Sequence, residues 1–254
     1  GKAELLAALI NALAMLAVVF VIGWEAWQRL QSPAQIDGAT VSVVAIVGLL
    51  VNLLVAWILS RGEQNINIRG ALLHVMGDAL GSPMIKPMLV DQGWSNGQLG
   101  QLTLISSLAG IGGALLGGLL YARLGALKSL LGFGALQALG IAGMAALVSQ
   151  GTSTLWVYGV ALFEQCADGM STVALFAVMM RQCRAEHEGA DFTLQACVQL
   201  LLAGVVGALS GVLAKVLGYQ ALFLTAGVLG MLALVVVGDS VARQPASLQG
   251  VAQP

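Results

Sequence analysis

Residues 99–148 read LGQLTLISSLAGIGGALLGGLLYARLGALKSLLGFGALQALGIAGMAALV, two apolar runs separated by a short segment that contains Arg123 and Lys128. Each run is about 20 residues long, the length at which an α-helix crosses a hydrocarbon core of about 30 Å. Because a chain in lipid must satisfy its own backbone hydrogen bonds, the two runs predict membrane-spanning helices. This stretch therefore indicates a helical membrane protein.

The same pattern recurs along the whole chain of 254 residues. Hydrophobic residues make up 58% of the chain and charged residues 9%, whereas a soluble domain carries about 25% charged residues. We predict an all-α, polytopic helical membrane protein with about eight spans and no extramembrane domain. The predicted helices are 5–24, 40–60, 70–90, 99–120, 127–148, 154–180, 192–217 and 220–238.

Lysine and arginine mark alternate connections between these helices. The segments DQGWSNGQ (91–98) and SQGTS (149–153) contain neither residue. Because basic loops stay on the cytoplasmic side, both termini are expected to be cytoplasmic. Arg29 in the first loop is the exception to this pattern. The basic connections contain Arg61 and Arg69, Arg123 and Lys128, Arg181 and Arg184, and Arg243 in the tail.

Several function classes are disfavoured by composition. The net charge of −1 offers no basic stripe for nucleic acid. Cys166, Cys183 and Cys197 form no paired spacing, so free thiols are expected. With two histidines in the chain and no arrangement of nucleophile, base and orienting group, an enzyme is not expected.

Residues 65–82, NINIRGALLHVMGDALGS, resemble the fifth transmembrane helix of the cation diffusion facilitator family of zinc and cadmium exporters. The resemblance reaches back to about residue 2 through INALAML, WEAWQRLQSP and VVAIVGLLVNLLVAWIL, which are similar to that family's third and fourth helices. It implies that His74 and Asp78 supply half of a four-ligand metal site whose other half comes from the family's second helix. On a helix the two residues share one face, where both can meet one cation. The alternative is that they bond to each other or to backbone groups.

From about residue 77 the chain resembles a second family. GDALGSPMIKPMLVDQGWSNGQLG, GGLLYARLGALKSL and FEQCADGMSTVALFAVMMRQC are similar to the C-terminal six-helix half of a major facilitator, in the subgroup that imports siderophores or muropeptides. The family's cytoplasmic gating-loop motif is matched by Gly118, Arg123, Gly125 and Lys128. Ala122 and Ala126 replace its acidic and its second basic residue, which disfavours a charge relay in this loop.

The sequence therefore looks like a chimera. We predict a cation-diffusion-facilitator-like segment at 1–76, a major-facilitator-like half at 77–240 and a cytoplasmic tail at 241–254, with the junction within 77–82. Whether the fusion is natural or engineered stays open.

Two acids lie inside the predicted span 154–180. Glu164 and Asp168 are four residues apart on one face, with Gln165 alongside. Buried acids near one another favour proton binding and release, which suits a proton-coupled importer. The alternative is a hydrogen-bonded polar seam in which Glu164 pairs with Gln195 or Gln199.

Lys86 lies between Pro83 and Pro87, which interrupt the helix 70–90 because each lacks a backbone N–H. Broken helices and buried charges mark substrate paths in transporters, so Lys86 is a solute-site candidate. The alternative is that Lys86 extends to the outer interface of the membrane.

Two further patterns have structural explanations. The glycine-rich runs 110–118 and 204–211 sit inside apolar helices, which favours small-residue helix packing over phosphate binding. The segment with Cys183, Glu186, His187, Glu188 and Asp191 fits no zinc spacing and is expected to be a solvated cytoplasmic loop.

The leading hypothesis is half of a secondary transporter for a siderophore-like or muropeptide-like solute in a bacterial inner membrane. The alternatives are a divalent-cation/proton antiporter and a non-transporting helical scaffold. The expected partners are the lipid bilayer and either a small solute or a divalent cation. Zinc is the one metal considered, and no other cofactor is expected. Homo-oligomerisation is plausible because faces that normally pack against absent helices would be exposed.

Overall fold

A computed structural model of the chain describes residues 2–31, 43, 68–149, 152–181, 183–184 and 186–242. The chain divides into two compact units, Gly1–Leu49 and Leu50–Pro254. In the first unit, helix α1 (Lys2–Gln31) contains the predicted span 5–24. The predicted helix 40–60 lies outside the described residues except for the helical Val43, and the predicted tail does so from residue 243 onward.

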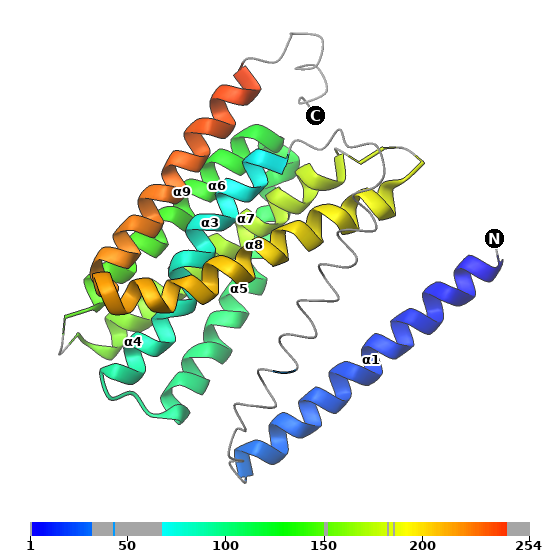
Figure 1. The fold of residues 1–254 in the computed structure, drawn as a ribbon. Coiled ribbons are helices and arrows are strands. Elements are labelled where there is room, and N and C mark those ends of the chain that lie inside the picture. The colour runs from blue at the N-terminus through cyan, green and yellow to red at the C-terminus, as the bar shows by residue number, and fades with distance from the viewer. Residues whose placement is uncertain are drawn as a thin grey trace. The chain divides into compact units, whose positions relative to one another are not determined.

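All regular secondary structure in the described part of the second unit is helical, and Figure 1 shows its elements. This confirms the all-α class. Four of its helical stretches are long and apolar enough to cross a membrane: 96–124, 126–147, 188–217 and 219–236. The exact number of spans stays a prediction. The elements are α3 (Ile68–Gly81), η1 (Ser82–Met84), α4 (Ile85–Asp91), α5 (Asn96–Leu124), α6 (Ala126–Gly143), η2 (Met144–Leu147), α7 (Thr154–Arg181), α8 (Glu188–Leu217) and α9 (Tyr219–Ala242).

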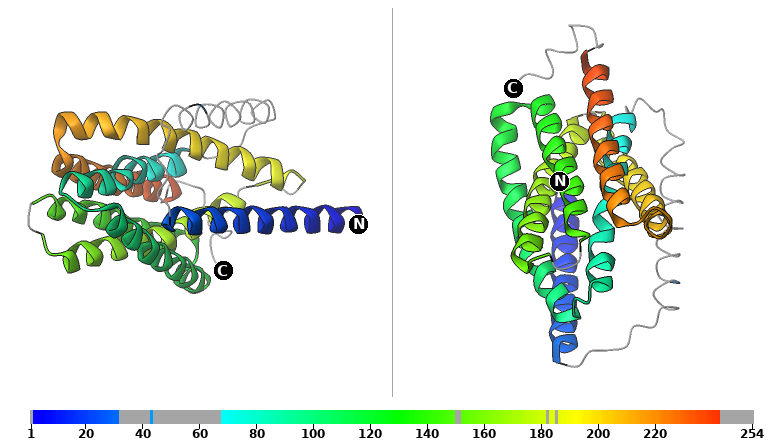
Figure 2. Two further views of the ribbon diagram at one scale, coloured as in Figure 1. Left: turned by 90° about the horizontal axis from the view of Figure 1, so that it is seen from below. Right: turned by 90° about the vertical axis from the view of Figure 1, so that its left-hand side faces the viewer.

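The helices of this unit form two packed groups. Helix α7 packs against α5 and α6, while α3 packs against α8 and α9, and the contact of α6 with α9 joins the groups. Figure 2 shows the green helices of the first group beside the orange α9 of the second. Helix α3 also meets α6 and α7, since Val75 and Ala79 pack in one cluster with Leu130, Leu175 and Met179.

Two sharp connections each consist of one glycine. Gly125 joins α5 to α6 with φ 76°, and Gly218 joins α8 to α9 with φ 80°. Each donates its N–H to the carbonyl oxygen four residues earlier, Tyr121 and Ala214 respectively, over 2.9 Å. Glycine suits both places because side chains disfavour positive φ.

The predicted interruption near Pro83 is confirmed. Helix α3 ends at Gly81, residues 82–84 form a single 3₁₀ turn, and α4 begins at Ile85. Pro83 cannot donate a hydrogen bond to the carbonyl of Ala79, so the regular α-helical ladder stops here. The break therefore places Ser82 in a 3₁₀ turn between two α-helices.

The glycines of α5 pack as predicted. Gly113 and Gly117 are buried, and a Cβ at Gly113 would overlap the carbonyl of Cys166 on α7. A Cβ at Gly117 would lie 2.7 Å from Cα of Met170. The run at 204–211 contributes less, because a Cβ at Gly204 or Gly211 would meet nothing within 4 Å.

Candidate functional site

Glu164 is the most deeply buried acid of the described residues. Its side chain is 2% exposed and points into the bundle from α7. Gly140 on α6 leaves the space for it, since a Cβ there would lie 2.9 Å from Cα of Glu164 and 3.0 Å from its Cβ. Burying an acid in an apolar bundle is costly unless its oxygens are hydrogen-bonded. The partners of Glu164 therefore define the site.

One partner comes from the broken helix. Ser82 Oγ lies 2.8 Å from Glu164 Oε1 and 2.6 Å from Asp78 Oδ1. Gln165 Nε2 donates to the second oxygen, Glu164 Oε2, over 3.0 Å. A single hydroxyl thus joins two carboxyl groups that are far apart in the sequence.

Asp168 forms the other side of the cluster. Gln137 on α6 donates from Nε2 to Asp168 Oδ1 over 2.8 Å. Gln137 is 3% exposed, and its side-chain carbonyl oxygen has no hydrogen-bond partner in the described structure. Asp78 and Asp168 are partly buried, whereas Glu164 is buried. Two hydrogen-bonded groups therefore meet α7: Ser82 with Asp78 and Glu164, and Gln137 with Asp168.

The alternative pairing of Glu164 with Gln195 or Gln199 is wrong. Gln195 Nε2 bonds instead to the carbonyl of Met179 at 3.3 Å and to Cys183 Sγ at 3.6 Å. The side-chain oxygen of Gln199 has no hydrogen-bond partner. The two oxygens of Glu164 accept instead from Ser82 Oγ and from Gln165 Nε2.

His74 and Asp78 are the two predicted metal ligands. His74 belongs to α3, but its side chain lies outside the described part of the structure. Asp78 Oδ1 accepts a hydrogen bond from Ser82 Oγ, four residues along the chain, at 2.6 Å. Among the described residues, no three His, Cys, Asp or Glu side chains lie together as a metal site would need. The metal site stays a prediction.

Lys86 lies on the outside of α4. Its side chain is exposed, whereas the adjacent Ile85 is buried in the core. Every lysine, arginine and histidine whose side chain is described is exposed as well. The buried interior of the described bundle therefore carries acids without buried basic partners.

The gating-loop motif surrounds a tight turn. Gly125 is the single residue between α5 and α6, and its φ of 76° explains the glycine. Arg123 and Lys128 are exposed at the two helix ends, and a Cβ at Gly118 would meet nothing within 4 Å. The glycine that the motif has at position 125 is therefore explained by the positive φ of this turn.

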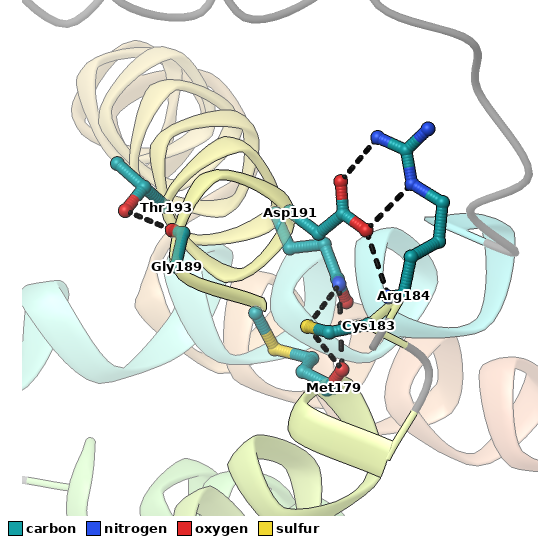
Figure 3. A network of polar contacts seen from close by, with 7 residues as sticks. Met179, Cys183, Arg184, Gly189, Asp191 and Thr193 are labelled. Carbon is teal, nitrogen blue, oxygen red and sulfur yellow. Dashed lines mark hydrogen bonds and ion pairs between the residues drawn. The ribbon is translucent and has the colours of Figure 1, made fainter. Parts of the chain in front are cut away.

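Asp191, in the first turn of α8, is bound by Arg184 from the connection between α7 and α8, as Figure 3 shows. Asp191 is 4% exposed and accepts from Arg184 Nε at 3.0 Å, from its terminal nitrogen at 2.8 Å and from its backbone N–H at 2.9 Å. The prediction of a solvated loop is wrong for Asp191, although Glu186, His187 and Glu188 are exposed. An acid in the first turn of a helix is the signal that could have indicated this contact.

Sequence reasoning missed Ser82 and Gln137 as members of the site. Gln137 could have been found, since it is a polar residue inside the apolar run of α6. Ser82 carries no comparable signal, because serine is common beside proline and its contact with Glu164 depends on how α3 packs against α7.

Two family models match the sequence, and they overlap at residues 68–116. The cation efflux transmembrane domain matches residues 1–116, and the Major Facilitator Superfamily matches residues 68–250. The second match begins at the first residue of α3, earlier than the predicted boundary at 77. Both predicted resemblances are thereby confirmed at the level of the family, while the major-facilitator subgroup and the position of the junction stay predictions.

The similar curated proteins are metal transporters. Zinc transporter ZitB of Escherichia coli (strain K12) is 44% identical over 79 residues, which cover 30% of this chain and 25% of ZitB. A cadmium, cobalt and zinc/H(+)-K(+) antiporter of Bacillus subtilis (strain 168) is 45% identical over 82 residues, 31% of this chain and 26% of the antiporter. The metal cation efflux system protein CzcD of Cupriavidus metallidurans is 45% identical over 80 residues, 31% of this chain and 25% of CzcD. The chain spans about a quarter of the length of these relatives.

Proposed function

Because the chain belongs to the Major Facilitator Superfamily through residues 68–250, we propose that it serves as one half of a secondary transporter working by alternating access. The chain is a membrane transport protein by both family matches. The solute that we propose is siderophore-like or muropeptide-like, on the strength of the sequence resemblance of residues 77–240. We place it in a bacterial inner membrane with both termini cytoplasmic.

The observation that carries this proposal is the buried Glu164, which shares Ser82 with the partly buried Asp78 and has the partly buried Asp168 four residues along α7. Intramembrane acids are costly to bury and are retained where they bind ions, protons or solutes. Glu164 and Asp168 are the residues that we propose to take up and release the coupling proton, and Gln165 orients Glu164 by donating to Oε2. Lys86, exposed in the first turn of α4, is proposed to lie at the membrane interface.

Uptake into proteoliposomes tests this assignment. Glu164→Gln and Asp168→Asn keep the shape of each side chain but cannot release a proton, so each is expected to reduce pH-gradient-driven uptake at least tenfold. Glu186→Gln, an exposed loop acid, is the matched control and should transport like the parent chain. Uptake that survives both Glu164→Gln and Asp168→Asn would remove the proton role from these acids.

A second candidate function rests on the first part of the chain. The cation efflux match and the named relatives support divalent-cation transport through His74 and Asp78. Zinc needs about four ligands in a structural site and three protein ligands in an open one, so this pair requires others. Calorimetry with zinc tests this second function. Binding at micromolar zinc that disappears in His74→Ala supports it, and no binding contradicts it.

A further inference from the structure

We propose that Gln137 and Asp168 form a binding site for a primary ammonium group of the transported solute. This inference deepens the proposed function and rests on it for the claim that the bound molecule is the cargo. Binding itself depends only on contacts between α6 and α7, so it can be tested without transport.

Gln137 is a buried amide that uses one of its two polar ends. Its Nε2 donates to Asp168 Oδ1 over 2.8 Å, whereas its Oε1 has no hydrogen-bond partner among the described residues. The side chain is 3% exposed, and a buried acceptor without a donor is destabilising. Turning the amide over would set Oε1 against the ionised carboxyl group of Asp168, where two acceptors would meet. Gln137 Oε1 is therefore an acceptor that a bound group can satisfy.

Asp168 is the accessible member of this pair. It is partly buried, whereas Gln137 is buried. Its carboxyl group also accepts a hydrogen bond from Thr172, one turn further along α7. A carboxylate offers about four lone-pair sites, so Asp168 can accept another donor besides Gln137 and Thr172. A group bound to Asp168 therefore lies next to the amide of Gln137.

One ligand atom can bridge the two acceptors. Because the oxygen and nitrogen of an amide are about 2.3 Å apart, Gln137 Oε1 and Asp168 Oδ1 are separated by at most about 5 Å. Two hydrogen bonds of about 2.9 Å from one tetrahedral nitrogen span nearly that distance. A single nitrogen with at least two hydrogens can therefore donate to the amide oxygen and to the carboxyl group together.

Charge decides which group fits. Anionic groups such as carboxylates are excluded, because they bring further acceptors and are repelled by Asp168. Every described lysine, arginine and histidine side chain is exposed, and Glu164 lies one turn before Asp168 on α7. A primary ammonium group has three N–H donors and a positive charge. A hydroxyl donates only one hydrogen, and a water molecule has no charge to balance the acids.

The site ranks the proposed solutes. Siderophore-like or muropeptide-like molecules that carry a primary amine should bind better than molecules whose polar groups are all anionic. Helices α6 and α7 would then recognise the cationic end of the solute, with Gln137 as the residue that selects N–H donors.

Saturation-transfer NMR of the purified full chain with methylammonium tests the site. Tetramethylammonium has the same charge without any N–H, and acetate has the opposite charge. Methylammonium should bind the parent chain with a millimolar Kd, as expected for so small a ligand. Tetramethylammonium should bind at least about tenfold more weakly because it cannot donate, and acetate should not bind. No methylammonium binding, which would leave Gln137 to water alone, or equal binding of the two cations would overturn the proposal.

Two substitutions locate the bound cation. Gln137→Leu removes the free acceptor, and Asp168→Asn removes the charge while keeping the shape, so each should weaken methylammonium binding at least about tenfold. Gln101→Leu, at an exposed glutamine of α5, is the matched control and should bind like the parent chain. Circular dichroism checks the fold of each variant, and the comparison of cations on the parent chain does not depend on it. Full binding by folded Gln137→Leu and Asp168→Asn would overturn the proposal.

Uptake into proteoliposomes separates the site from the proposed function. Methylammonium binding that requires Gln137, in a chain that takes up no solute, would support the site and contradict the proposed function. Uptake driven by a pH gradient in a chain that does not bind methylammonium would overturn the site alone.

Discussion

At the scale of single residues, the space that holds Glu164 is made by a missing side chain. Gly140→Ala would place a methyl group 2.9 Å from Cα of Glu164, and backbone atoms cannot move aside as a flexible side chain can. We expect this substitution to push α7 away from α6, to lower the free energy of unfolding by about 1–3 kcal/mol and to weaken the contact with Ser82.

The matched control for that prediction is Gly132→Ala on the same helix, where the new methyl group would meet nothing within 4 Å. Chemical denaturation in detergent measures both variants. Equal stability of the two would show that α6 and α7 are less closely packed at Glu164 than described.

Gly125 has a backbone conformation that residues with a side chain rarely adopt. Its φ of 76° and ψ of 174° lie in a region that is essentially limited to glycine. Gly125→Ala should therefore destabilise the chain by about 1–3 kcal/mol. Gly118→Ala, in the same motif but on an open helical face, should be neutral or stabilising by up to about 1 kcal/mol. Unfolding midpoints measure the difference, and a harmless Gly125→Ala would count against the one-residue turn.

The acids of the site could be found from the sequence, but their partners could not. Glu164 and Asp168 stand out because charged residues are rare within apolar runs. Ser82 and Glu164 are 82 residues apart in the sequence, and no local sequence pattern predicts that they are in contact. The contact exists because of how α3 packs, which periodicity alone does not determine.

At the scale of elements, the closest packing lies between α5 and α7. Gly113→Ala would overlap the carbonyl of Cys166, so the two helices would have to separate. We expect a loss of about 1–3 kcal/mol in the free energy of unfolding. Gly112→Ala, the adjacent residue with nothing within 4 Å, should cause no loss. If thermal unfolding cannot distinguish the two variants, this interface is not as close as described.

Helices were easier to predict than their pairings. Apolar length located the helices of the second unit, and proline chemistry located the break at 82–84. Helix ends were less predictable, because capping groups such as the Ser95 and Gln98 pair extend α5 beyond its apolar run. Which helices pack together depends on small residues on particular faces, and these are spread over several helices.

At the scale of the whole molecule, cysteine labelling tests which side of the membrane each end of the bundle faces. Cys183 lies between α7 and α8, in a connection proposed to be cytoplasmic. With Cys166 and Cys197 replaced by serine, an impermeant maleimide should label Cys183 in inside-out vesicles and not in right-side-out vesicles. Burial raises the pKa of the Cys183 thiol, so labelling should accelerate as pH rises and the thiolate forms.

The control for orientation is a cysteine at the opposite end of the bundle. Gly97→Cys, combined with replacement of all three native cysteines, should label from the other side of the membrane, since Gly97 is exposed in the first turn of α5. Labelling of both positions from the same side would contradict the proposed topology.

The two family matches meet in α3, which belongs to the compact unit of the facilitator-like helices. Val75 and Leu80 are buried there, in clusters that include Leu175 of α7 and Leu222 of α9. The part of the chain that resembles the exporters' metal-binding helix thus packs as the first helix of the facilitator-like bundle. Our central claim is that this packing sets Asp78 beside Glu164.

Cysteine cross-linking tests that claim most directly. A Cβ at Gly81 would lie 3.1 Å from Cβ of Ala226 on α9, close to the separation of about 3.8 Å in a disulfide. Because that Cβ would overlap Ile141, the pair Gly81→Cys and Ala226→Cys is made with Ile141→Ala in a chain without native cysteines. Rapid intramolecular disulfide formation in membranes is predicted, with none when Val228→Cys, on the exposed face of α9, replaces Ala226→Cys. No cross-link for the first pair, or equal cross-linking for both, would contradict the placement of α3 and with it the site.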